Sequence, residues 1–104
     1  MLQFVLISIN KCNQGAVQIS NGNFRAFLYG RKWYPIRAIM NDAFLQMGKN
    51  NKLTTDRALV ELSYILPYLR IAKIDFKNNL PSDIKDLDVI IEAKLINETL
   101  RRLL

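Results

Sequence analysis

The sequence predicts an α+β domain in which a small antiparallel β-meander sheet has two or three helices packed on one face. Two observations lead to this fold class. Short β-branched and aromatic runs, separated by turn residues, fill the first third of the chain. Behind Pro35, apolar residues recur with a helical spacing. The 104 residues, half of them apolar, are expected to form a single domain over 1–104 with one core.

The meander is expected over 1–34. Leu2–Ile9 is apolar and rich in β-branched residues, which predicts a buried strand, and it is too short to span a bilayer. Three further strands are expected between turn residues: Ala16–Ser20, Phe24–Tyr29 and Lys32–Tyr34. Asn21-Gly22-Asn23 favours a hairpin because an Asn-Gly pair accepts positive φ angles, and Gly30-Arg31 predicts a second turn.

Three helices are expected, at about 35–47, 55–66 and 84–104, with a short strand at Ile71–Phe76 before the last one. Pro35 suits the first turn of a helix, and Gly48 suits the residue after its end. Thr54 or Thr55 is expected to cap the second helix.

Ser82 or Asp83 is expected to begin the last helix. Its apolar residues cover more than one face. Two interpretations stay open: an ordinary core helix, or a helix that forms a homodimer or contacts a further domain.

The charge of the chain is uneven. The net charge is +6, and the first 41 residues contain five basic residues and no acidic one. Such a surface favours an acidic partner, which can be nucleic acid or an anionic membrane surface. There is no His and one cysteine, Cys12, which is expected in a loop. This excludes a Ser-His-Asp triad and an intramolecular disulfide, and it argues against a zinc site. No metal or cofactor is expected.

Basic and aromatic side chains are interleaved around one turn. Alternation along Phe24–Tyr29 places Phe24 on the core face, and Arg25, Phe27 and Tyr29 on the opposite face. Cations can hold phosphates while rings stack on bases, so this pattern is typical of a nucleic-acid-binding surface. The candidate site is Arg25, Phe27, Tyr29, Arg31, Lys32, Trp33, Tyr34 and Arg37.

Trp33 and Tyr34 have a competing interpretation, because such rings at a strand–helix junction often fill a core. Neighbouring residues of a strand point to opposite faces. We therefore expect Trp33 in the core and Tyr34 exposed on the binding surface.

The same residues are similar to a family. The matching segments are Tyr29–Ile39, Leu53–Ala58 and Leu69–Ile71, within roughly Phe24–Phe76. They resemble a small Gly-Arg/Lys-x-Tyr-Pro module of bacterial restriction-type proteins, found beside HNH-type nucleases and similar to the DNA-reading domains of modification-dependent restriction enzymes. The resemblance implies that Arg31, Tyr34, Pro35 and Arg37 belong to the family's basic-aromatic motif, although Lys is usual where this chain has Arg37. It also implies a nuclease domain or subunit as a partner.

The main functional hypothesis is therefore a non-catalytic DNA-binding module, a reader in a restriction or defence system. The expected location is the cytoplasm, with no membrane contact. The alternative is a protein-interaction or dimerisation module that uses the Asp83–Leu104 helix. A third hypothesis, a nuclease fragment, rests on four scattered residues: Asp42, Asp56, Asp75 and Lys77.

Overall fold

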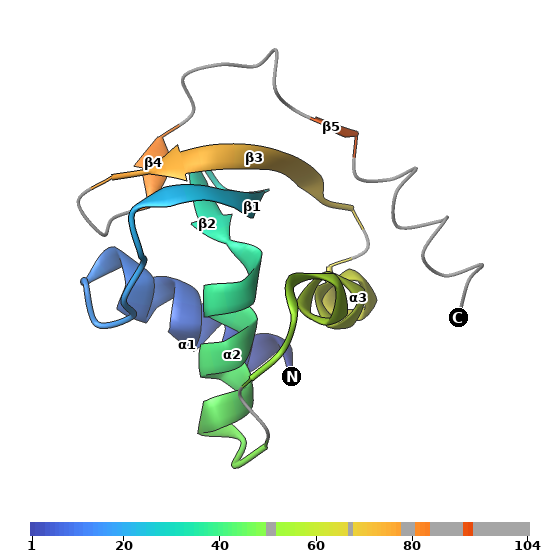
Figure 1. Ribbon diagram of the computed structural model, residues 1–104. Helices are drawn as coiled ribbons and strands as arrows, with labels where there is room; N and C mark the ends of the chain where they lie inside the picture. Colours follow the sequence, from blue (N-terminus) through green and yellow to red (C-terminus); the bar gives the residue numbers. More distant parts are fainter. Residues whose placement is uncertain (50–51, 67, 78–80, 84–90, 93–104) are drawn as a thin grey trace.

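A computed structural model describes residues 1–49, 52–66, 68–77, 81–83 and 91–92. Within these residues, three helices lie on one side of an antiparallel sheet (Figure 1): α1 (Leu2–Asn13), α2 (Ile36–Gln46) and α3 (Thr55–Ile65). The longer strands are β1 (Gly22–Tyr29), β2 (Lys32–Pro35) and β3 (Arg70–Phe76). Two-residue strands, β4 (Ser82–Asp83) and β5 (Ile91–Glu92), lie at the edges in the order β4-β2-β1-β3-β5. This is the α+β arrangement that the sequence predicts.

The N-terminal element differs from the sequence prediction, because Leu2–Asn13 forms a helix and not a buried strand. The side chains that α1 buries follow a helical spacing: Val5, Ser8, Ile9 and Cys12. A strand of this composition would need cover on both of its faces. The helix buries one stripe against α2 and leaves Leu2, Leu6 and Ile7 exposed.

The sheet contains one of the two expected hairpins. β1 and β2 are joined at Gly30, which has a φ of 63°, and Tyr29 pairs with Lys32. The hairpin expected at Asn21-Gly22-Asn23 does not form, since residues 16–20 belong to no strand and Gly22 begins β1. The second neighbour of β1 is β3. β1 is thus the central strand, and the order of strands is not that of the meander expected over 1–34.

The two middle helices agree with the sequence prediction. α2 is followed by Gly48 at a φ of 70°, a left-handed conformation that glycine adopts without strain. α3 is capped by Thr54, whose Oγ1 accepts a hydrogen bond of 3.2 Å from the Arg57 backbone N–H.

The last expected helix is corrected in its described part. Ser82–Asp83 pair with β2, and Ile91–Glu92 pair with β3, so these four residues belong to the sheet. The remainder of the expected 84–104 helix lies outside the described residues.

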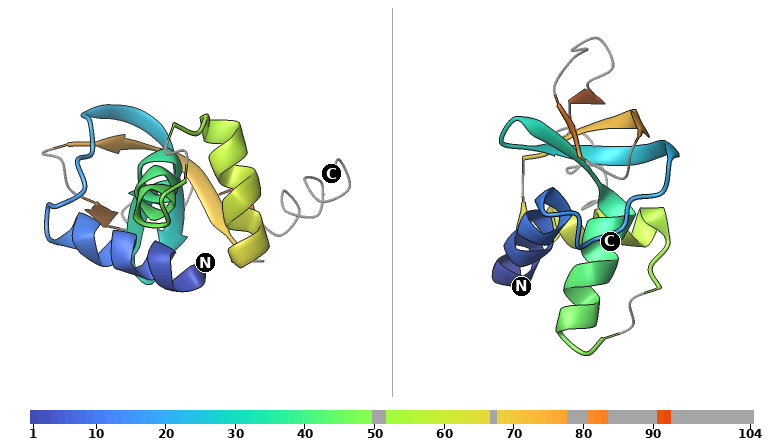
Figure 2. Two further views of the ribbon diagram at one scale, coloured as in Figure 1. Left: turned by 90° about the horizontal axis from the view of Figure 1, so that it is seen from below. Right: turned by 90° about the vertical axis from the view of Figure 1, so that its left-hand side faces the viewer.

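α2 is at the centre of the core. It contacts α1, α3, β1 and β2, and it buries Ile36, Ile39, Met40 and Ala43. Seen along its axis, α2 lies between α1 and α3 (Figure 2). Because Ile36 follows β2 directly, the N-terminus of α2 lies against the sheet. This junction forms part of the candidate site.

Candidate nucleic-acid interface

The eight residues of the sequence-predicted site fall into three places in the fold. Phe27, Trp33 and Tyr34 are buried, with exposed fractions of 0%, 1% and 3%. Tyr29, Arg31 and Lys32 are exposed at the β1–β2 turn. Arg25 and Arg37 line a pocket. The structure therefore does not unite the predicted residues in one patch.

The buried rings correct two expectations. Trp33 is a core residue, as predicted, but Phe27 and Tyr34 were expected on the exposed face. They are cross-strand partners with ring centroids 5.9 Å apart. The Tyr34 hydroxyl donates a hydrogen bond of 3.1 Å to Asn13 Oδ1 of α1, and burial raises the pKa of Tyr34. Because α2 packs against β1 and β2 and Asn13 of α1 reaches Tyr34, these rings have no surface left for stacking on bases.

The turn between β1 and β2 keeps its cationic side chains in solvent. Arg31 and Lys32 are exposed, with the partly exposed ring of Tyr29 beside them. Four residues of β1 separate Arg25 from Tyr29, where the turn that carries Arg31 begins, and this corresponds to about 13 Å. We call Tyr29, Arg31 and Lys32 the hairpin tip.

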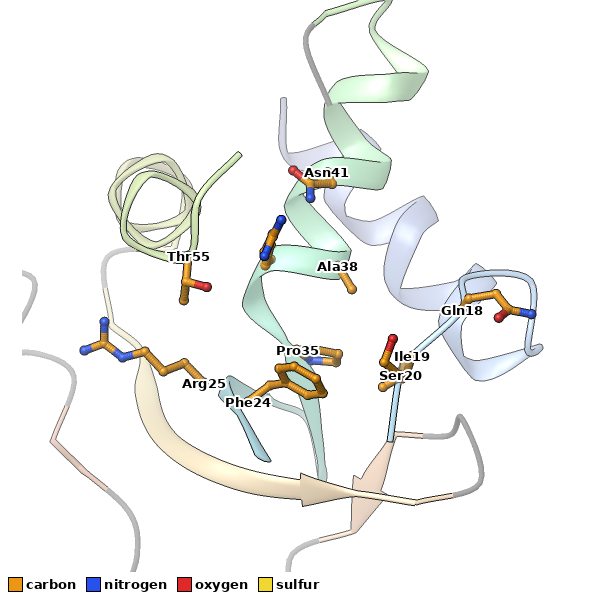
Figure 3. Close-up of a pocket in the computed structure, with 10 residues that line it drawn as sticks. Gln18, Ile19, Ser20, Phe24, Arg25, Pro35, Ala38, Asn41 and Thr55 are labelled. Atoms are coloured by element: carbon orange, nitrogen blue, oxygen red, sulfur yellow. The ribbon is translucent and has the colours of Figure 1, made fainter. Parts of the chain in front are cut away.

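The pocket lies where β1, the N-terminus of α2 and the segment before β1 meet. It has a volume of about 340 Å³ (Figure 3). Its lining residues include no carboxylate: Gln18, Ile19, Ser20, Phe24, Arg25, Pro35, Arg37, Ala38, Asn41 and Thr55. In the close-up, Phe24 lies between Thr55 and Arg25 on one side and Ile19 and Ser20 on the other. The pocket is thus lined by two arginines, an aromatic ring and several neutral polar groups, and the guanidinium group of Arg25 points away from Phe24 in Figure 3.

The N-terminus of α2 adds to the positive potential of the pocket. Pro35 is its N-cap residue and provides no side-chain hydrogen bond, and the first turn contains no acidic residue. The backbone N–H groups of this turn lack intrahelical acceptors, and the helix dipole is positive here. Arg37 belongs to this first turn and lines the pocket. Helix and side chain together favour an anion at this end of α2.

Arg25 is held by a carboxylate at the edge of the pocket. Its Nη1 lies 3.1 Å from Oδ1 of Asp56, in the first turn of α3. The Asp56 side chain is 91% exposed. Exposed ion pairs contribute little to stability. A phosphate can therefore replace Asp56 on Arg25 without a large cost to the fold.

Phe24 is the residue that the sequence prediction missed. It was expected on the core face, yet its side chain is 40% exposed and lines the pocket. Its ring contacts Phe76 of β3 with centroids 6.5 Å apart. A ring fixed in this way from one side can offer the rest of its surface to a ligand. Its position near the start of β1, before the buried middle of the strand, is the one feature that could have indicated the exposure of Phe24.

Of the residues of the nuclease hypothesis, Asp75 and Lys77 contact each other, whereas Asp42 and Asp56 have other partners. Asp42 links α1 to α2, and its carboxylate accepts hydrogen bonds from Ser8 Oγ (2.6 Å), Lys11 Nζ (2.8 Å) and Gln46 Nε2 (2.9 Å). Asp75 pairs with Lys77 at 3.8 Å, and Asp56 pairs with Arg25. No three Asp, Glu, Cys or His residues of the described part of the chain come together as metal ligands.

Cys12 lies in α1 and not in a loop. It is a free, buried cysteine. Burial, together with the negative charge of Asp42, raises the pKa of Cys12 to about 11 despite an opposing effect of Lys32. At neutral pH the thiol is therefore protonated, and a nucleophilic role for it is not supported.

Comparison with protein-family models, with curated proteins and with solved structures finds no match to this chain. Among the residues that the structure describes, no helix has the length and apolar character needed to cross a membrane.

Proposed function

We propose that this chain is a non-catalytic nucleic-acid-binding domain with DNA as its ligand. In this proposal, Arg25 and Arg37 hold phosphates at the pocket, and Arg31 and Lys32 of the hairpin tip hold phosphates farther along the ligand. Phe24 takes the stacking role that the sequence analysis gave to Phe27 and Tyr34.

The single observation behind the proposal is the composition of the pocket. Two arginines and an uncapped helix N-terminus line a cavity, and none of its described lining residues is a carboxylate. Phosphodiesters are anions that guanidinium groups and helix N-termini bind well. The neighbouring Phe24 ring suits a base, because every base has a π-face that can stack on an aromatic side chain. A cationic small molecule would be repelled by the two arginines.

The biological setting of the proposal comes from the resemblance to restriction-type DNA-reading modules. A reader of this kind works with a nuclease domain or subunit, and we propose such a partner for this chain. The motif residues of the resemblance have different environments, since Tyr34 and Pro35 are buried while Arg31 and Arg37 are exposed. Of these four motif residues, only Arg31 and Arg37 are therefore proposed as DNA contacts.

A titration of labelled duplex and single-stranded DNA at several salt concentrations tests this function. The affinity of the wild-type chain is expected to fall steeply with salt, because bound phosphates release counterions. Arg37→Gln is expected to weaken binding to all probes and to reduce the slope of log K against log salt by about 0.9 on duplex DNA.

Lys49→Gln is the matched control, because it removes the same charge beyond the opposite end of α2, where Lys49 contacts the Phe44 ring. Equal losses for the two variants would contradict the pocket as the binding site. A molecular mass that rises with concentration, together with no affinity for any probe, would instead favour the protein-interaction alternative.

A further inference from the structure

Two cationic side chains lie directly opposite each other in the sheet. Arg25 of β1 and Lys73 of β3 are cross-strand partners, and both are exposed. Paired residues of an antiparallel ladder point to the same face, and their Cα atoms lie only about 4.5–5.5 Å apart. Like charges in such positions repel each other. This repulsion is located at the edge of the pocket, because Arg25 also lines the pocket.

Among the described residues, the charges near this pair compensate only Arg25. Asp56 approaches Arg25. The next acidic residue on β3, Asp75, pairs with Lys77. Across β1–β3, Asp75 lies opposite the neutral Asn23. Among the ion pairs of the described residues, none involves Lys73.

We propose that Arg25 and Lys73 together hold a single phosphodiester group of a nucleic-acid chain, adjacent to the pocket. Asp56 occupies Arg25 in the free protein and is displaced when this phosphate binds. An anion bound between the two cations offsets their repulsion. Binding of an anion therefore explains a pair that would otherwise only destabilise the sheet. Lys73 then extends the binding surface from the pocket onto β3, so the ligand is a chain of several nucleotides and not a lone phosphate.

This inference rests on the proposed nucleic-acid function and is tested with four variants of the full chain: Arg25→Gln, Lys73→Gln, the two together, and Lys77→Gln. Lys77→Gln is the matched control. It removes an exposed lysine that lies four positions after Lys73, directly beyond the end of β3. The probes are a 12-nucleotide single strand and a 12-base-pair duplex, and affinity is measured at several salt concentrations.

Sharing of one phosphate makes the two substitutions non-additive. We expect Lys73→Gln to reduce the salt slope on duplex by less than about 0.9, because Arg25 still holds the phosphate, and the double variant to lose about 0.9 in total, the value for one phosphate contact. Lys77→Gln is expected to leave the slope unchanged. The melting temperature of Lys73→Gln at low salt is expected to equal or exceed that of the wild type, because the repulsion is removed.

The results separate this inference from the proposed function. A slope loss of about 1.8 in the double variant would show two separate phosphate contacts and overturn the shared site. Equal effects of Lys73→Gln and Lys77→Gln, or a lower melting temperature of Lys73→Gln, would overturn it as well. In these cases the proposed function stands as long as Arg37→Gln weakens binding. Absence of binding by the wild-type chain to both probes would overturn both proposals.

Discussion

Tyr34 places its ring and its hydroxyl in different surroundings. The ring packs on Phe27 inside the core, while the hydroxyl bonds to Asn13 of α1, whose side chain is exposed. Trp33, one residue earlier, is also buried, and the sheet register places it opposite Leu28 and not Phe27. The two neighbours thus point to opposite faces of the sheet, and both of these places are closed to solvent. Stability, and not stacking on DNA, is the role that these surroundings support.

Substitutions at these two positions are expected to change stability by different amounts. Trp33→Ala is expected to lower the free energy of unfolding by roughly 3–5 kcal/mol, since it removes a large buried side chain. Tyr34→Phe is expected to cost about 0.5–1.5 kcal/mol, because one hydrogen bond is lost while the ring remains. Urea unfolding measures both, with Tyr29→Ala as the control for an exposed ring.

DNA affinity of the folded Tyr34→Phe variant is expected to match that of the wild type. A loss of affinity with unchanged stability would show that Tyr34 contacts the ligand after all, and would restore the original assignment of this ring.

At the scale of elements, α1 shows how a strand and a helix can be confused. Its apolar and β-branched residues favour a strand locally, which is why Leu2–Ile9 is predicted as a strand from the sequence. The helical signal is the position of its polar residues, because Ser8 and Cys12 belong to the same buried stripe as Val5 and Ile9. Ser8 has a partner only because Asp42 and Gln46 of α2 are near it. That contact is tertiary and cannot be read from residues 2–13 alone.

The link between α1 and α2 is expected to make stability depend on pH. Burial alone would raise the pKa of Asp42, but hydrogen bonds from Lys11, Ser8 and Gln46 and the charge of Lys11 lower it overall. A carboxyl group whose pKa is lower in the folded state stabilises the fold at pH values above its ordinary, unfolded pKa of about 3.9. This stabilisation is expected to disappear as the pH falls from about 4 through the lower pKa of the folded state.

Urea midpoints measured between pH 7 and pH 2 test this expectation. Asp42→Asn should be less stable than the wild type at pH 7 and should show a flatter decline below pH 4. Asp56→Asn, which changes an exposed carboxylate, serves as the control. Parallel pH curves for the wild type and Asp42→Asn would contradict a stabilising role of the charged carboxylate.

At the scale of the whole molecule, local patterns and long-range contacts had different predictive value. α2, α3, β3 and the β1–β2 hairpin follow from helical periodicity, caps and turn residues, which are local properties. The strand order does not, since the pairing of β1 with β3 joins segments about fifty residues apart. The same limit applies to the site. Charge asymmetry pointed to Arg25 and Arg37, whereas the burial of Phe27 and Tyr34 depends on which face of the sheet the helices cover.

The separation of the pocket from the hairpin tip leads to a prediction about ligand length. About 13 Å of strand lies between Arg25 and the turn that carries Arg31, a distance that corresponds to roughly four base pairs of duplex at 3.4 Å each. A 12-base-pair duplex can reach both sets of cations, whereas a dinucleotide bound in the pocket cannot reach the hairpin tip. Arg25→Gln with Arg37→Gln is therefore expected to weaken the binding of both ligands.

Arg31→Gln with Lys32→Gln is expected to weaken duplex binding, to lower its salt slope by about 1.8, and to leave dinucleotide binding unchanged. Lys49→Gln with Lys77→Gln removes the same charge elsewhere and controls for the net charge of the molecule. Isothermal titration of the four proteins with each ligand gives the comparison. If the hairpin-tip variant also loses dinucleotide binding, the two sets of cations act through the overall field of the protein; if it keeps full duplex affinity, DNA contacts the pocket alone.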